Sequence, residues 1–369
     1  MLPIVNGSPS IRAALREDPA VRRIIRSWRT LTGGTPVRDP QRRTLVACSA
    51  GVDSSALAIA LAVASRHVVL GHVVHDLRPA PQACADAAAA SDLADRLGVP
   101  FVRCSIAVAA LAGNAEHNAR VHRYRALAAL AKGQACPFIA TGHHADDQLE
   151  TMLMRLIRGG SIKALAGIRE RRSCHGATLL RPSLGVTRED CVRICTIAGW
   201  KGVNDATNED QARTRARLRA QVLPVLRAIR PAAALRAASL ARMLDSAARA
   251  IEDDALAVIN TAVKSSDGVW SIGLGDLRSL RAAVLVEVLA ALHARVCRDV
   301  EAEDRTAIRG DDLDRAVAAI ARDASDVRRL RLGDMILTIG SREVAARLDA
   351  TRLSPRPVRP ASRPPSPEE

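Results

Sequence analysis

Aromatic residues and closely paired cysteines are scarce in this 369-residue chain. Phe, Trp and Tyr together make up 2% of the residues, which argues against a surface of rings that stack on single-stranded bases. The eight cysteines include no CxxC pair, so we expect buried, reduced thiols and no zinc site, iron–sulfur cluster or disulfide. Cys191 and Cys195 lie one helical turn apart and cannot complete a metal site alone.

Long apolar runs and an excess of acidic residues are also missing. No apolar run reaches the ~18 residues that a membrane span needs, and the first residues contain no signal-peptide core, so we expect a cytoplasmic protein with no membrane partner. The 54 Lys and Arg residues exceed the 39 Asp and Glu residues, giving a net charge of +15. Coding bias can enrich Arg, but a charge of this sign favours a polyanionic partner such as nucleic acid.

Strand-like and helical patterns alternate between residues 44 and 158, which predicts an α/β fold with a parallel, doubly wound sheet. Short apolar runs predict four strands, in TLVACS, HVVLGHVVH, PFVRCSI and CPFIATG. Apolar residues spaced three and four apart predict helices at 54–66, 82–97, 115–132 and 145–158. Ligands of such sheets bind at the carboxyl ends of the strands, where the polar segments of this sequence lie.

The rest of the chain is expected to be mainly helical. The strand pattern fades after Arg158, and helical patterns dominate from Thr187, with long helices at about 232–263 and 275–297 and strand-like runs at 327–348. We therefore expect an N-terminal arm or helix at 1–42, an α/β domain at 43–205, a mainly helical domain with short terminal strands at 206–349, and a disordered Pro-rich tail at 350–369.

The segment LVACSAGVDSSALAIAL, residues 45–61, predicts a turn from a buried strand into a helix. Gly51 allows the backbone to bend or to approach a ligand, and Ser54 or Ser55 can cap the helix. The first N–H groups of a helix form an anion site, for which a phosphate chain is a natural ligand. Asp53 would repel phosphate unless a divalent cation lay between them. An ordinary capped turn is the alternative.

Two helix faces carry polar residues near the same sheet edge. In TGHHADDQLETMLMRLIRGG, residues 141–160, His143, Asp147 and Glu150 fall on one face and could position a cation, a nucleophile and an anionic leaving group. The alternative is a solvated helix whose carboxylates balance nearby arginines.

In AEHNARVHRYRAL, residues 115–127, a second face holds Glu116, Arg120 and Arg123, where a surface ion pair is the alternative. In HVVHDLRP, His72, His75 and Arg78 follow the second strand. No third and fourth zinc ligand has suitable spacing there, so we expect loop polarity or a substrate contact.

These motifs together resemble a known family. SAGVDS at 49–54 is similar to the pyrophosphate-binding SGGxDS loop of the N-type ATP pyrophosphatases, or PP-loop proteins. HVVHDLRP, ExxARxxRY and TGHHADDQLET follow in the order and spacing of tRNA(Ile)-lysidine synthetases, and RGGSIKALAGI, LLRPSL, TRED, NDATN and RARLRAQVLP resemble later motifs of that family. The similarity extends from about Thr44 to Leu226.

The resemblance implies ATP-dependent joining of free L-lysine to the wobble cytidine of tRNA(Ile) with a CAU anticodon. The C2 oxygen of the cytidine is adenylated, pyrophosphate leaves, and the ε-amino group of lysine attacks C2 and displaces AMP. ATP and Mg²⁺ are the implied cofactors, and residues 43–205 are the implied ATP-binding catalytic domain.

The resemblance also implies roles for individual residues. The ATP-binding loop comprises Ser49, Ala50, Gly51, Val52, Asp53 and Ser54. Asp53, His143 and Asp147 are the catalytic candidates, and Asp53 and Asp147 are the Mg²⁺ ligands. Lysine or another part of the substrate would contact Glu116, Arg120, Arg123 and Glu150. Arg213, Arg215, Arg217 and Arg219 would contact tRNA phosphates, although their alternate spacing spreads charge over more than one helix face.

The chain departs from the family pattern at several positions. Ala50 stands at the first glycine of the loop, where a positive φ would be costly. Asp76 replaces a usual glycine, and Ala216 replaces an asparagine. A tRNA thiolase with the same adenylation loop, which the lack of paired cysteines disfavours, and an inactive RNA-binding relative remain as alternatives. For the oligomeric state, a homodimer is one expectation.

Overall fold

The computed structural model describes residues 9–77, 79–111, 115–158, 161–203, 214–298, 306, 308–322 and 326–349, except the side chains of Pro9 and Glu116. The chain divides into two compact units between Ser246 and Ala247. Residues 214–246 therefore belong to the first unit. The domain boundary expected at residue 205 stays a prediction. The expected Pro-rich tail lies outside the described residues.

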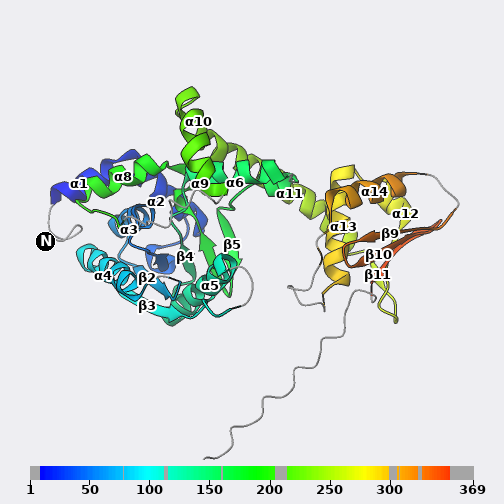
Figure 1. The fold of residues 1–369 in the computed structure, drawn as a ribbon, viewed down its shortest axis with the longest axis horizontal. Helices are drawn as coiled ribbons and strands as arrows, with labels where there is room; N and C mark the ends of the chain where they lie inside the picture. The colour runs from blue at the N-terminus through cyan, green and yellow to red at the C-terminus, as the bar shows by residue number, and fades with distance from the viewer. Residues whose placement is uncertain are drawn as a thin grey trace, which may run out of the picture. The chain divides into compact units, whose positions relative to one another are not determined.

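A sheet surrounded by helices forms the centre of the first unit (Figure 1). It has six strands, in the order β3-β2-β1-β4-β6-β5. Its strands are β1 Thr44–Ala47, β2 Val68–His75, β3 Phe101–Ile106, β4 Phe138–Ala140, β5 Arg171–Cys174 and β6 Ala177–Leu180. All neighbouring strands are parallel except β5, which pairs antiparallel with β6. The expected parallel α/β sheet is confirmed.

Helices cover both faces of this sheet. They are α1 Pro9–Glu17, α2 Pro19–Leu31, α3 Val52–Ala64, α4 Ala80–Leu97, α5 Ala115–Gly133 and α8 Arg188–Ile197. Two more helices follow β4, α6 Ala145–Arg158 and α7 Ile162–Leu165, and they pack against each other. Val46 packs into a core shared with α1–α4 and α8, whereas its neighbour Leu45 packs into a second core with α5. Successive strand residues point to opposite faces, so these two cores lie on opposite sides of the sheet.

This arrangement creates a crevice beside β1. The helix after β1 covers one face, and α5, which leads to β4, covers the other. The strand order therefore reverses between β1 and β4, and ligands of doubly wound sheets bind at such a reversal. The N-terminal residues help to close one face, because Trp28 of α2 is fully buried and its indole N–H donates to Thr44 Oγ1 (3.0 Å).

A basic helical segment packs against α6. It consists of α9 Thr214–Arg217, a π-helical turn Leu218–Val222 and α10 Leu223–Ile229, and α11 Ala233–Ile259 follows. Leu218 and Leu223 share a small core with Ala145 and Leu149 of α6. This packing places the arginines of α9 and the π-helical turn beside the acidic residues of α6.

The described part of the second unit combines an antiparallel sheet with the C-terminal half of α11 and three further helices. The strands are β7 Val263–Lys264, β8 Trp270–Gly273, β9 Arg328–Leu332, β10 Met335–Ile339 and β11 Glu343–Leu348, in the order β7-β8-β11-β10-β9. The three further helices are α12 Leu274–Arg278, α13 Ala282–Val296 and α14 Gly310–Ala321. Alternate residues of β10, Met335, Leu337 and Ile339, enter one core with these helices, so one face of the sheet is covered.

Two sequence expectations were wrong in detail. No strand was expected soon after Arg158, yet β5 and β6 form a hairpin there. The sequence pattern did not reveal it, because β5 is an edge strand whose Arg171 and Arg172 stay exposed. The single helix expected at 275–297 is divided into α12 and α13 by a break at 279–281. The strand-like runs at 327–348 are confirmed as β9, β10 and β11. No helix in the described part of the chain is long and apolar enough to cross a membrane.

Candidate active site

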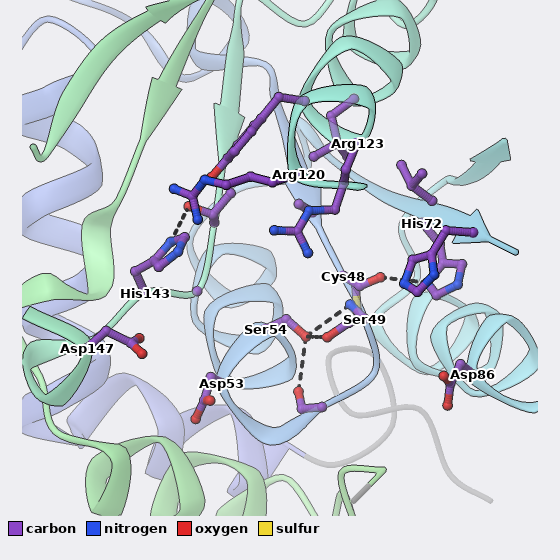
Figure 2. A pocket seen from close by; sticks show the side chains of 18 of the residues that line it. Cys48, Ser49, Asp53, Ser54, His72, Asp86, Arg120, Arg123, His143 and Asp147 are labelled. Carbon is purple, nitrogen blue, oxygen red and sulfur yellow. Dashed lines mark hydrogen bonds between the residues drawn. The ribbon is translucent and has the colours of Figure 1, made fainter. Parts of the chain in front are cut away.

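A pocket of about 1080 Å³ opens at the carboxyl ends of β1, β2 and β4. Four segments that are far apart in the sequence line it: the 49–54 loop, α5, α6 and the basic segment 214–219. Figure 2 shows the loop facing the N-terminal turn of α6 across this pocket, with arginines of α5 extending over it. The two polar helix faces expected from the sequence therefore meet the loop at one site.

The loop residues divide into two groups. Ser49, Gly51, Asp53 and Ser54 line the pocket, whereas Ala50 is fully buried and Val52 packs against the same core. The expected capping by Ser54 or Ser55 was wrong, because α3 begins at Val52 and its N-cap, Gly51, makes no side-chain capping bond. The Ser54 hydroxyl instead donates to the Gly51 carbonyl (3.0 Å) and accepts from the Ser49 N–H (3.1 Å).

The backbone of the loop is tightly held. Ala50 has φ of +61°, so its Cβ is tolerated in a conformation that glycine adopts more readily. Gly142, which follows β4, lies so close that a Cβ there would be 2.7 Å from the Asp53 carbonyl oxygen. A helix start without a side-chain cap, held rigidly at the end of a buried strand, is the geometry that binds a phosphate chain.

Asp53 and Asp147 converge on one imidazole, that of His144. Nε2 of His144 lies 3.5 Å from Oδ2 of Asp53 and 3.5 Å from Oδ2 of Asp147. Its Nδ1 lies 3.5 Å from Oδ2 of Asp146. The other oxygen of Asp53, Oδ1, is buried and has no hydrogen-bond partner among the described residues.

The three carboxylates set the charge of His144. Burial alone would lower the pKa of this imidazole, but the Asp147 charge and the close contacts with the Asp146 and Asp53 carboxylates raise the pKa to about 10. Burial would raise the pKa of Asp146, yet the contact with His144 and the hydrogen bond from Arg227 hold that pKa well below its ordinary value. Burial would also raise the pKa of Asp53, but His144 lowers it, and the net shift is downward. Asp53, Asp146 and His144 are therefore ionised at neutral pH, with the His144 cation between the carboxylates.

Glu150 is buried on the next turn of α6 and is bound by two arginines. Its side chain is 1% exposed, and Nε of Arg215 and Nε of Arg219 each lie 2.8 Å from one of its oxygens. The same guanidinium groups lie 3.4 and 3.6 Å from Oδ1 of Asp147. The alternative of a solvated α6 face is therefore wrong, because partners from another segment bind these carboxylates.

His143 has the opposite electrostatic environment to its neighbour. Burial and the positive charges of Arg181, Arg120 and Arg123 hold the pKa of His143 well below its ordinary value. Nδ1 of His143 lies 2.9 Å from Thr141 Oγ1. The imidazole is therefore neutral at pH 7 and can contact a phosphate only by donating a single ring N–H.

Arg120 and Arg123 extend from α5 towards the space between the loop and His143 (Figure 2). Both guanidinium groups lie over the ring of Tyr124, at 5.4 and 5.8 Å from its centroid. Both charged groups are thus supported by a buried aromatic ring, and both residues line the pocket. This arrangement suits an anionic ligand.

The remaining candidates lie in different settings. His72 lines the pocket and its Nδ1 lies 2.8 Å from the Cys48 carbonyl oxygen, whereas Asp76 accepts hydrogen bonds from the Val108 and Ala109 N–H groups and does not line the pocket. Arg217 is exposed and also does not line it. The predicted roles of Arg78, Arg213 and the Glu116 side chain fall outside the described residues.

Sequence reasoning missed His144 and Asp146. Each is the neighbour of a candidate residue in GHHADD, residues 142–147, namely His143 or Asp147. Helical spacing counted from His143 places His144 and Asp146 on a different face from the candidates. The first turn of α6 begins at Ala145, so His144 precedes the helix and helical spacing does not apply to it. A further missed residue is Arg188, which lines the pocket and donates its backbone N–H to Asp146 (2.8 Å).

Comparison with known proteins shows the family of this chain. The family model described as the PP-loop domain matches residues 22–226. The tRNA(Ile)-lysidine synthase of Salinispora tropica is 40% identical over 253 residues, which cover 67% of this chain and 74% of that protein. This chain belongs to the PP-loop tRNA(Ile)-lysidine synthase family.

Other members of the family have similar identity. The tRNA(Ile)-lysidine synthase of Salinispora arenicola is 36% identical over 73% of this chain and 80% of that protein, and that of Bordetella bronchiseptica is 35% identical over 67% and 73%. Among solved structures, a U34-tRNA thiolase, NcsA, from Methanococcus maripaludis matches with a TM-score of 0.50 and 14% identity, covering 62% of this chain and 81% of that one. That likeness shows the fold alone.

Proposed function

We propose that this chain is a carbon–nitrogen ligase that uses ATP to join free L-lysine to C2 of the wobble cytidine in tRNA(Ile), giving lysidine. The observation that carries the proposal is the meeting of the SAGVDS loop with His143 and with Asp147 of α6 in one pocket, in a chain of this family. ATP would enter with its phosphates against the first turn of α3. Arg120 and Arg123 supply positive charge on the other side of the phosphate chain.

The reaction divides into two balanced steps. The C2 oxygen of the cytidine attacks the α-phosphate of ATP, a P–O bond forms, and pyrophosphate leaves. The ε-amino group of lysine then attacks C2, a C–N bond forms, and the C–O bond breaks as AMP departs with the oxygen. Adenylation is needed because the C2 oxygen by itself is a poor leaving group. The arginines and the α3 N-terminus stabilise the charge that develops on the phosphates.

Asp53 and Asp147 fit a Mg²⁺ ion that accompanies ATP. Carboxylate oxygens are the ligands that Mg²⁺ prefers, and Oδ1 of Asp53 is buried without a hydrogen-bond partner among the described residues. His144, itself a cation, lies 3.5 Å from an oxygen of each of the two carboxylates, so positive charge is stabilised at this place. When bound, Mg²⁺ would neutralise phosphate charge and help orient the triphosphate.

The lysine substrate requires acidic partners and a proton acceptor. Glu150 is a candidate for its ammonium group, but Arg215 and Arg219 bind this carboxylate in the structure. Lysine binding at Glu150 would therefore have to move at least one guanidinium group, which could then contact tRNA phosphate. Glu116 remains the second candidate. Neutral His143 can donate to a phosphate oxygen, and a carboxylate or the departing AMP would accept the proton that lysine loses.

The proposed chemistry also bears on the cellular location and the tRNA target of the protein. ATP, lysine and tRNA meet in the cytoplasm, so we propose a cytoplasmic enzyme, with the CAU anticodon as target and Arg217 among its phosphate contacts. A homodimer remains an expectation. The thiolase alternative lacks support from the site, because only Cys48 of the eight cysteines lines the pocket.

The test follows each half of the reaction separately. Purified protein is incubated with Mg²⁺, a tRNA(Ile) transcript and ATP labelled at the α-phosphate, first without lysine and then with labelled lysine. We expect labelled adenylated tRNA in the first case and lysine incorporation in the second. Asp53→Asn and Asp147→Asn should lose both, while Asp76→Asn, outside the pocket, should retain both. Sulfur incorporation would favour a thiolase, and salt-sensitive RNA binding without either product would favour an inactive relative.

A further inference from the structure

Three side chains that can bind metals meet in the second unit, and the proposed reaction does not use them. They are His293, Cys297 and Asp334, and one donor atom of each lies within 4.8 Å of the other two. Cys297 is fully buried, Asp334 is 5% exposed, and His293 is half-buried. We propose that these residues form a site for a divalent transition-metal ion, with zinc as the favoured ion.

Local structure brings two of the donors to one face of a helix. His293 lies in the last turn of α13, and Cys297 is its C-cap, with the Cys297 N–H donating to the His293 carbonyl (2.9 Å). Side chains four residues apart on a helix project to the same side. The HARVC segment therefore offers an imidazole nitrogen and a sulfur to a single position.

The third donor comes from the tight turn between β9 and β10. Gly333, at φ +58°, begins the turn, and a Cβ there would lie 2.9 Å from His293 Nε2 and 2.5 Å from the Thr306 carbonyl oxygen. Only glycine lets the turn approach the imidazole this closely. Oδ2 of Asp334 accepts a hydrogen bond from the Thr306 N–H (2.6 Å), which fixes the carboxylate, as supporting hydrogen bonds do for metal ligands.

The distances are close to those of a bound ion. For three atoms no more than 4.8 Å apart, some point lies within about 2.8 Å of all three, against about 2.0–2.3 Å for bonds from zinc to nitrogen, oxygen and sulfur. Small side-chain rotations would close this difference. A fourth position remains for water, as in zinc sites with three protein ligands.

Charge and ligand type favour zinc over Mg²⁺. A thiolate and a carboxylate carry two negative charges, which are costly to bury, and a divalent ion cancels them. Nitrogen and sulfur donors suit zinc, copper or cobalt, whereas Mg²⁺ prefers oxygen donors. A bound ion would link the end of α13 to the β9–β10 turn and stabilise the fold of the second unit. The sequence led us to expect no zinc site. Spacing could not reveal this cluster, because Asp334 is 37 positions from Cys297.

The experiment uses the full chain and does not depend on catalysis. Protein stripped with a chelator is titrated with Co²⁺, and the near-ultraviolet band from thiolate-to-cobalt charge transfer is followed. We expect one equivalent to saturate the band and Zn²⁺ to abolish it by displacement. After zinc loading and gel filtration, elemental analysis should find one zinc per chain, and zinc should raise the thermal unfolding temperature.

Variants separate this site from adventitious thiol binding. Cys297→Ser and His293→Gln should each lose the stoichiometric zinc and the thermal shift, and Cys297→Ser should lose the band. Cys84→Ser removes an exposed thiol elsewhere and should change nothing. His293→Gln, at a half-buried position, keeps the test informative if Cys297→Ser does not fold. The proposal is overturned if wild-type protein binds no stoichiometric zinc, or if binding survives in His293→Gln, or is lost in Cys84→Ser.

Discussion

His144 gives the most exacting test of the electrostatics of the pocket. Its imidazole is 2% exposed and lies 3.5 Å from oxygens of Asp53, Asp146 and Asp147. The substitution His144→Gln keeps a hydrogen-bonding side chain but removes the positive charge. We expect this variant to lose stability in a way that depends on pH, because the three carboxylates then lack their shared cation.

The magnitude follows from the pKa. A rise from the ordinary value of 6.5 to about 10 corresponds to about 5 kcal/mol of folding free energy at low pH. Because the folded pKa is the higher one, this contribution is complete below about pH 6.5 and disappears as the pH rises through about 10. At pH 7 it amounts to about 4 kcal/mol.

The assay reports on the first unit alone. Trp28 and Trp200 belong to the first unit and Trp270 to the second, so in a Trp270→Phe background the fluorescence follows unfolding of the first unit. Urea unfolding at pH 6, 8 and 10 should show the stability difference between His144 and His144→Gln shrinking as the pH rises. NMR of histidine-labelled protein should show the His144 resonance titrating near pH 10.

His143→Gln is the matched control. The pKa of His143 is held low by burial and nearby arginines, so its neutral form is favoured in the folded protein. Relative to His143→Gln, wild-type stability should fall as the pH drops below about 6.5, since only the unfolded state then takes up the proton. The reasoning is refuted if His144 titrates near 6.5, or if both variants show the same dependence on pH.

Three further outcomes are expected. Replacing Arg215 and Arg219 together by Gln leaves the buried charge of Glu150 unpaired and should cost about 3 kcal/mol in urea unfolding, and adding Glu150→Gln should recover part of this loss. Ala50→Val places a β-branched residue at φ +61° and should cost more than about 2 kcal/mol, while Ala50→Gly should change stability by less than about 1 kcal/mol because relief of strain offsets lost burial. Gly142→Ala should displace the loop backbone and weaken ATP binding by about tenfold or more in calorimetry. Stability or affinity equal to wild type would contradict the corresponding statement.

Periodicity in the sequence predicted the first four βα units well. The helix expected at 145–158 is α6 Ala145–Arg158, and the cap expected at Thr187 accepts a hydrogen bond from the Asp190 N–H. Long amphipathic helices and buried strands give strong local patterns, because one face must be apolar to pack. The convergence of the loop and the two polar helix faces followed from the placement of ligands at the ends of parallel strands.

The parts that could not be predicted depend on tertiary contacts. The edge strand β5, RRSC, has no apolar face, and only its pairing with β6 makes it a strand. The partners of Glu150 lie 65 and 69 positions away, so spacing could not reveal them. The positive φ of Ala50 arises from the path between β1 and α3, and alanine gives no local signal for such a conformation.

The most direct measurement of the central claim is the identity of the modified nucleoside. A tRNA(Ile) transcript with the CAU anticodon is incubated with the protein, ATP, Mg²⁺ and lysine, digested to nucleosides and examined by mass spectrometry. We expect the wobble cytidine to gain the mass of one lysine less one water, with AMP and pyrophosphate formed in equal amounts. An unchanged cytidine, or one that has gained sulfur, would contradict the account.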